Sequence, residues 1–341
     1  MFRETSQRIL LRSITLHSNL KEAHTFLKES PHVASYITVL SLWLAWNRPA
    51  SYIASLQQIL QVATLVNVRK CVLADMGDIF RASYHTPAST LLDFLAHQPL
   101  RELHLSKATA VPPAVILRLL STAPHVSFIS VSVEKDSRTS LDTFRSPPNA
   151  PKVEGLDVRH DAEDVYELLA LPQFKSCISA LRRLFVNSMH VYSMDDPRSY
   201  VQLPPLSMPI LSPAFPLLRS AEFSVFMDRQ PAPWLDFVLA TVCTSPLLSD
   251  ITISFIPRSE TDWKDIHTHV LDGALLASLD AELAAHHARP VIRWRLDFLD
   301  NSDSADIFTD FTTAAETAMP KMCEEKRLLL EMYDQSAERW G

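Results

Sequence analysis

A six-residue pattern recurs along the chain, with apolar residues at its first, fourth and sixth positions. Its clearest copy is Leu100-Arg101-Glu102-Leu103-His104-Leu105. Further copies begin between 26 and 43 residues apart, at Leu11, Ile37, Val68, Val126, Val153, Leu181, Leu218, Leu248 and Val291. Side chains two positions apart share one face of a β-strand, so each copy predicts a short strand that is buried on one face.

Most intervals between these copies contain one helical pattern that stops at a proline. Three examples precede Pro99, Pro124 and Pro246, and they cover Ser89–His97, Pro113–Ser121 and Trp234–Thr244. Proline cannot continue a helix, and it disfavours the helical conformation of the residue before it. The sequence therefore predicts a repeated unit of strand, loop, helix and proline stop.

These units predict an α/β fold, a leucine-rich-repeat-like solenoid with a parallel concave sheet over residues 11–300. One unit cannot bury its apolar face alone, so stacked neighbours would supply the core. Alternation of short strands and helices is also compatible with a doubly wound sheet. Residues 301–341 are predicted to form a C-terminal helical cap, with one helix from about Phe308 to Tyr333.

Composition argues against several classes of function. The chain has four glycines among 341 residues, whereas phosphate loops, dinucleotide fingerprints and nucleophile elbows all need glycine. We therefore expect no enzymatic activity, no catalytic residues and no cofactor. The net charge of −7 argues against nucleic acid as the main ligand. No apolar run is long enough to span a membrane, so a membrane partner is not expected.

Several residues could support chemistry, but a structural explanation fits each better. No metal is expected, because the candidate ligands lack the spacing of metal sites. These candidates are His267 with His269, His286 with His287, the pair Asp195-Asp196, and the group Asp300, Asp303 and Asp306. The four cysteines are far apart in sequence, which favours a reducing compartment, cytoplasmic or nuclear. Three of them, at positions 71, 177 and 243, occupy apolar positions and are predicted to lie in the core. Lys321, Lys326 and Arg327, with Glu324 and Glu325, are predicted to form a mixed-charge helix face that is either solvated or paired with another helix.

The strand positions between the buried ones should point away from the core. These outward residues combine aromatic groups with both signs of charge, the composition that protein interfaces favour. We therefore predict that a protein partner binds Trp43, Glu102, His104, Phe128, Asp157, Arg159, Arg183, Phe185, Glu222 and Arg295, with Lys70, Asp250 and Arg293 on the same surface.

Three segments of the N-terminal region form a recognisable motif: the predicted strand at Leu11–Leu16, Phe26-Leu27, and Ser30-Pro31-His32-Val33-Ala34-Ser35-Tyr36-Ile37. Together they resemble the start of the repeat region in fungal F-box and leucine-rich-repeat-like proteins. Over the rest of the chain it is a likeness of pattern, as at Phe215-Pro216-Leu217-Leu218. It implies a repeat fold and a role in recognising substrates for a ubiquitin ligase.

In that family an F-box of about forty residues precedes the first repeat strand and docks on the adaptor of a cullin ligase. Only ten residues precede Leu11, and we interpret them as a remnant of the last F-box helix, so docking on the adaptor is doubtful. The main hypothesis is a non-enzymatic protein-binding module inside the cell. Two alternatives remain open, an enzyme of a hydrolase-like α/β class and a truncated paralogue without function.

Overall fold

The computed structural model describes most of the chain, in two compact units. Unit 1 comprises residues 1–168 and 172–178, and unit 2 comprises residues 169–171 and 179–341. The residues described are 10–17, 19–44, 50–61, 65–80, 85–134, 151–159, 165, 168–188, 214–227, 234–257, 273–297 and 304–333. Two proline-rich intervals, 139–151 and 186–218, are predicted from the sequence to contain surface excursions, and most of their residues lie outside the described ranges.

Unit 1 alternates strands and helices. Its strands are β1 (Ser13–Leu16), β2 (Val39–Trp43), β3 (Lys70–Ala74), β4 (Glu102–Val111), β5 (His125–Val133) and β6 (Gly155–Arg159). Each pairs in parallel with the next one along the chain. The helices are α2 (Leu20–Glu29), α3 (Pro31–Ala34), α4 (Ala50–Leu60), α5 (His85–His97), α6 (Pro113–Leu120) and α8 (Lys175–Ile178), with a 3-10 turn at Pro172–Phe174.

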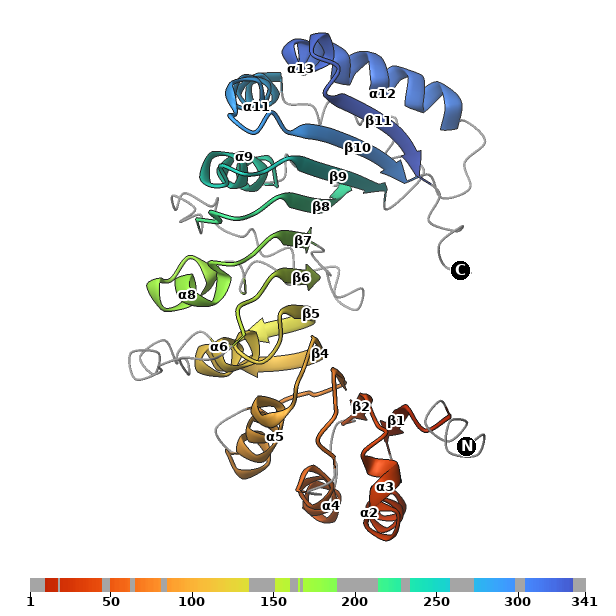
Figure 1. Cartoon of the computed structure of the whole chain (residues 1–341). Coiled ribbons are helices and arrows are strands. Elements are labelled where there is room, and N and C mark those ends of the chain that lie inside the picture. Colours follow the sequence, from red (N-terminus) through yellow and green to blue (C-terminus); the bar gives the residue numbers. More distant parts are fainter. Residues whose placement is uncertain are drawn as a thin grey trace, which may run out of the picture. The chain divides into compact units, whose positions relative to one another are not determined.

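Unit 2 continues the same alternation. Its strands are β7 (Arg183–Ser188), β8 (Ser220–Met227), β9 (Asp250–Pro257), β10 (Val291–Asp297) and β11 (Leu328–Tyr333), again parallel and in chain order. The helices are α9 (Trp234–Thr244), α11 (Gly273–Ala285), α12 (Ser304–Ala318) and α13 (Pro320–Glu324). Within each unit, Figure 1 shows the helices on one side of the strands. The α/β class and the parallel strands are thus as predicted.

The core of unit 1 is built from aligned positions of successive strands. The strand register places the fourth and sixth positions of the six-residue pattern in two rows across the sheet. The sixth-position row is completely or almost completely buried and consists of Leu16, Leu42, Leu73, Leu105, Phe128 and Val158. Burying one such side chain contributes about 1.5–3 kcal/mol, so the repeated pattern is what holds the strands together.

The core of unit 2 is centred on three aromatic rings. Trp294 of β10 lies 5.6 Å from Phe255 of β9 and 5.6 Å from Phe311 of α12, measured between ring centroids. All three side chains are fully buried. Edge-to-face and tilted arrangements at this separation are favourable for aromatic rings, and here they attach α12 to the sheet.

Helices α5, α6 and α9 end shortly before a proline, as the sequence predicts. Helix α5 ends at His97, two residues before Pro99, and α9 ends at Thr244, two residues before Pro246. Helix α6 ends at Leu120, four residues before Pro124. The chain then enters the next strand within a few residues, so the end of each of these helices lies beside the start of the following strand.

The prediction that Phe128 points outward is wrong. Phe128 pairs with Leu105 and Val158, both of which face the core, and its exposed fraction is 0%. The copy of the pattern in β5 begins at Ala123, not at Val126. The large apolar residues Val126 and Ile129 match the pattern better than the small Ala123, so the sequence favours a start at Val126. The two starts differ by an odd number of residues, and the sequence-based one therefore places Phe128 on the opposite face of the strand.

The predicted helix from about Phe308 to Tyr333 is correct only in its first part. Helix α12 ends at Ala318, Pro320 begins the short helix α13, and Leu328–Tyr333 forms strand β11 beside β10. Position 320 favours a helix start because proline there loses no intrahelical hydrogen bond. The tail therefore repeats the helix-to-strand order.

Arg327 is buried, with an exposed fraction of 6%, and so does not belong to a solvated helix face. Its Nη1 donates to the carbonyl oxygens of Leu283 and Pro290 at 3.1 and 3.0 Å, and its Nε donates to Glu325 at 2.8 Å. A buried guanidinium needs such partners, because a charge without them is costly. Lys321 and Lys326 are exposed, as a solvated face requires.

Candidate partner-binding surface

The outward face of each unit is the sheet face opposite the buried rows. In unit 1 the register aligns the outward residues of β2 to β6 in rows across the sheet. The predicted residues on this face of unit 1 are Trp43, Lys70, Glu102, His104, Asp157 and Arg159. None of them is buried.

Glu102 is the centre of a charged group on β3 and β4. Its Oε2 lies 2.8 Å from Nζ of Lys70, its direct partner in the register, and 3.5 Å from Nε2 of His104. The hydrogen bond from Lys70 lowers the pKa of Glu102; partial burial opposes this, and the charge of Lys70 and the contact with His104 lower the pKa further. The group therefore presents an ionised carboxylate that is paired with Lys70 and lies close to His104.

Trp43 is the large aromatic residue that the described part of this face exposes, with an exposed fraction of 41%. Its ring lies 6.4 Å from the ring of His17, which follows β1. Beneath them, the hydroxyl of Tyr52 in α4 donates to the carbonyl oxygen of Trp43 at 3.0 Å and also to that of His17. Tyr52 thus holds the backbone of the two residues whose rings are exposed on this face.

A second polar group lies on β5 and β6. The carboxylate of Asp157 accepts hydrogen bonds from Nε of Arg159 at 3.0 Å and from the hydroxyl of Ser127 at 3.3 Å, and Nη2 of Arg159 lies 2.9 Å from it. Arg159 occupies the next outward position along the same strand, so the pair follows directly from the period of two in a strand. These contacts restrict the orientation of the guanidinium group.

The outward face of unit 2 carries Arg183, Phe185, Glu222, Asp250, Arg293 and Arg295, all of them at least partly exposed. Glu331 of β11 joins the two arginines of β10, accepting from Nε of Arg293 at 2.8 Å and from Nε of Arg295 at 3.2 Å. Nη1 of Arg295 also lies 3.9 Å from Glu222. The two charge signs alternate across β8, β10 and β11.

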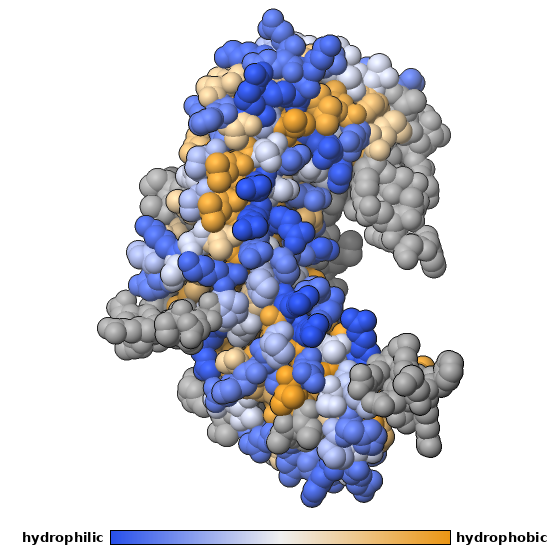
Figure 2. Space-filling view, in the orientation of Figure 1, coloured by the Kyte–Doolittle hydropathy of each residue, from blue (hydrophilic) through white to orange (hydrophobic). Residues whose placement is uncertain are grey.

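Small side chains lie beside this network. Ser224, Thr252 and Ser254 occupy outward positions of β8 and β9, and each is buried. In Figure 2, hydrophobic surface lies over the end of unit 2 that contains β10 and β11, beside hydrophilic surface. On β11, Leu329 pairs with the outward Arg293 and is exposed. The face therefore combines charge, hydroxyl groups and apolar area, as protein interfaces do.

Sequence reasoning missed two contributors to these faces and one set of residues at their edge. His17 stands just beyond the first copy of the pattern, and Glu331 lies in a strand that was predicted as helix. The set at the edge consists of arginines at the second position of the pattern, just before the strands, Arg12, Arg69, Arg101, Arg182 and Arg219, all exposed. Aligning the second positions of the copies would have found this set.

The other candidates for chemistry have separate outcomes. Cys71 and Cys177 are buried as predicted, whereas Cys243 is exposed, so its predicted place in the core is wrong. His267, His269, Asp195, Asp196, Asp300 and Asp303 lie outside the described residues. Within the described ranges, no three His, Cys, Asp or Glu side chains come together as metal ligands would. No helix there is both long enough and apolar enough to cross a membrane.

Comparison with known proteins gives no family for this chain. No protein-family model matches it, and no curated protein matches its sequence.

Proposed function

We propose that the protein is a non-enzymatic module that binds another protein through the outward faces of its sheets. The observation that carries this proposal is the exposed Trp43, whose backbone carbonyl is bound by Tyr52, on the same outward face as the group formed by Lys70, Glu102 and His104. An exposed aromatic anchor that shares a face with oriented polar groups is typical of the residues that dominate binding energy at interfaces.

We also propose that both units are leucine-rich-repeat-like stacks. In support, each unit has parallel strands in chain order, joined by segments that contain helices, and no reversal of strand order within the described part of either unit. A doubly wound sheet reverses its order at a switch point, where it binds its ligand. Repeat stacks instead use an extended sheet face for partners.

The resemblance of the first forty residues to F-box and leucine-rich-repeat-like proteins suggests what kind of partner the module binds. We propose that the module descends from substrate receptors of ubiquitin ligases and recognises a protein substrate. Affinity capture of the tagged protein from cells of its own source tests this descent. Recovery of the cullin-ligase adaptor supports it, and a specific partner without the adaptor indicates a freestanding module.

Site-specific photocrosslinking tests the binding surface. A benzoylphenylalanine placed at Trp43 should crosslink the partner, because this side chain is exposed on the outward face. The matched control is the same group at Phe26, which is exposed to a similar degree, 44% against 41%, but lies on helix α2. Crosslinking at Phe26 and none at Trp43 would place the partner on the helices and contradict the proposal.

A further inference from the structure

Arginine recurs at the second position of the six-residue pattern. In unit 1 this position is occupied by Arg12, Arg69 and Arg101 before strands β1, β3 and β4, and by Thr38 before β2. We call Arg12, Arg69 and Arg101 the basic rim. In unit 2 the same position holds Arg182 before β7 and Arg219 before β8.

Backbone hydrogen bonds bring the basic rim to one edge of the sheet. The carbonyl oxygen of Arg12 accepts the N–H of Thr38 at 2.9 Å, that of Thr38 accepts the N–H of Arg69 at 2.8 Å, and that of Arg69 accepts the N–H of Arg101 at 2.7 Å. Adjacent strands are about 4.8 Å apart. Arg69 and Arg101 are therefore immediate neighbours, and Arg12 is two strand spacings from Arg69.

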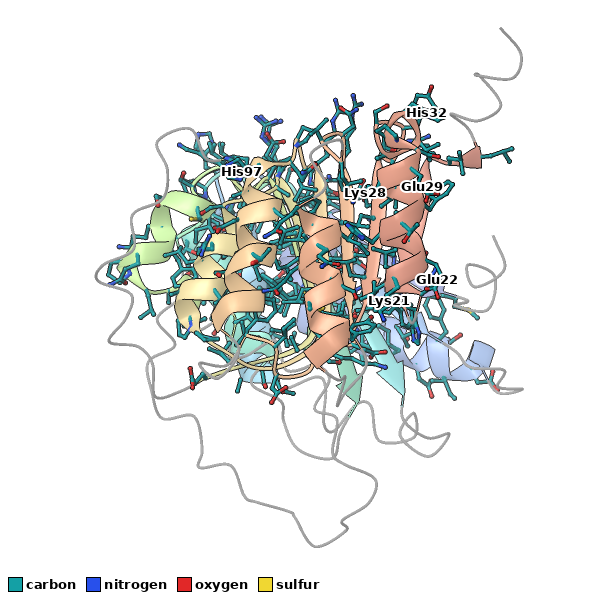
Figure 3. All side chains as sticks on the ribbon, turned by 90° about the horizontal axis from the view of Figure 1, so that it is seen from below. Lys21, Glu22, Lys28, Glu29, His32 and His97 are labelled. Atoms are coloured by element: carbon teal, nitrogen blue, oxygen red, sulfur yellow. The ribbon has the colours of Figure 1, made fainter. Side chains whose placement is uncertain are left out.

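The helix ends add a lysine and two histidines at the same edge. Helix α5 ends at His97, a few residues before Arg101, and α2 leads through α3 to Thr38. Figure 3 shows Lys28, His32 and His97 at this end of the helices, with Lys21 and Glu22 at the opposite end of α2. The acidic residues at the edge are Glu29, the already paired Glu102, and Glu154 before β6.

Among the described residues, the rim arginines have no carboxylate partner, unlike several other arginines of the protein. Arg118, Arg159, Arg289, Arg293, Arg295 and Arg327 each lie within 4.0 Å of a carboxylate oxygen. Within the part of the chain that the structure describes, Arg12, Arg69 and Arg101 form no ion pair, and Nε of Arg12 donates to the hydroxyl of Thr38 at 3.1 Å. Their charge is thus available to an external anion.

We propose that the basic rim binds an extended acidic peptide segment of the protein partner. A guanidinium group pairs with a carboxylate through two parallel hydrogen bonds, and an extended chain crossing the strand starts would pass each arginine in turn. The inference rests on the proposed function and names the chemistry of the partner.

The overall charge favours a short acidic segment over a long polyanion. The whole chain has a net charge of −7, and this negative charge repels a nucleic acid or an anionic membrane wherever they extend beyond the rim. Screening at physiological salt limits the attraction to about 8 Å, so a segment that contacts only the rim avoids most of that repulsion.

Fluorescence anisotropy of a labelled peptide in which Glu alternates with Ser tests the proposal. The full chain should bind this peptide and should not bind the matched peptide with Gln in place of Glu. The double variant R69Q/R101Q should weaken binding about three- to tenfold, the loss expected for two exposed ion pairs. The control K21Q/K107Q removes the same charge at the opposite end of the helix and strand layers of unit 1, and should change affinity less than twofold.

Several outcomes would overturn the inference. They are no binding of the Glu peptide by the folded wild type, an equal loss in both double variants, or tighter binding of a single-stranded RNA or of anionic lipid vesicles than of the peptide. These results are independent of crosslinking at Trp43. Crosslinking at Trp43 without peptide binding would contradict only the inference that the partner carries an acidic segment. Peptide binding without crosslinking at Trp43 would count against the sheet face as the interface.

Discussion

Phe128 on β5 lies directly opposite Leu105 on β4, and both side chains are completely buried. This register makes Phe128 part of the core of unit 1. Its replacement by alanine, Phe128→Ala, should therefore lower the free energy of unfolding by about 3–5 kcal/mol, because it removes buried area and leaves a cavity.

Chemical denaturation followed by circular dichroism measures this change. The control is Phe26→Ala, because Phe26 on α2 is 44% exposed and its loss should cost much less than that of a completely buried ring. Equal stability of F128A and the wild type would show that the assigned register of β5 is wrong.

The case of Phe128 shows which part of the fold could be predicted from the sequence. Strand and helix positions followed from large apolar residues and prolines, as at Leu103 and Pro99, because these signals are local. The face of β5 depended on which of two overlapping apolar sets faces the core, and only pairing with β4 decides that. Strand β11 was missed because its three consecutive leucines have no strict alternation.

The candidate surface was predictable in part for the same reason. Glu102 and His104 lie in the clearest copy of the pattern, and the structure places them outward. Their ion contacts join residues from separate copies, as between Lys70 and Glu102, and these depend on register between strands. The contact of Arg295 with Glu331 could not be expected while the latter was assigned to a helix.

Asp280 on α11 is a buried carboxylate that fixes the start of α13. Its two oxygens accept the backbone N–H groups of Lys321 and Met322 at 3.2 and 2.9 Å. Substitution with alanine leaves these N–H groups without their acceptor, and should cost about 1–3 kcal/mol of unfolding free energy. Thermal denaturation of D280A checks this, with the exposed Asp310→Ala on α12 as the control expected to be near neutral.

Lys70 should control the ionisation of Glu102. Because the ion pair lowers the pKa of Glu102 from 4.5, it stabilises the fold above the unfolded-state pKa, and this contribution disappears as the pH falls through the lowered pKa. Its size is at most about 1 kcal/mol at this partly exposed site. In K70M the pKa of Glu102 should rise towards 4.5, as followed by carboxyl carbon chemical shifts. An unchanged pKa would mean that the contact is absent in solution.

The cysteines should differ in reactivity. Burial raises the pKa of Cys71 to about 12, so almost no thiolate is present at pH 8 and alkylation should require unfolding. Cys243 is exposed, although partial burial and then Glu282 raise its pKa. Mass spectrometry should find Cys243 alkylated before Cys71, and faster still in E282Q. Rapid alkylation of Cys71 in the folded protein would contradict its burial.

The central claim is that the outward sheet face binds a protein partner, and the affinity of the isolated partner for variants of Trp43 tests it most directly. Isothermal titration calorimetry with W43A should give a Kd at least about thirtyfold weaker than that of the wild type, the loss expected for a central aromatic anchor. The helix-face control F26A should match the wild type. Wild-type affinity of W43A together with weakened binding by F26A would contradict the claim.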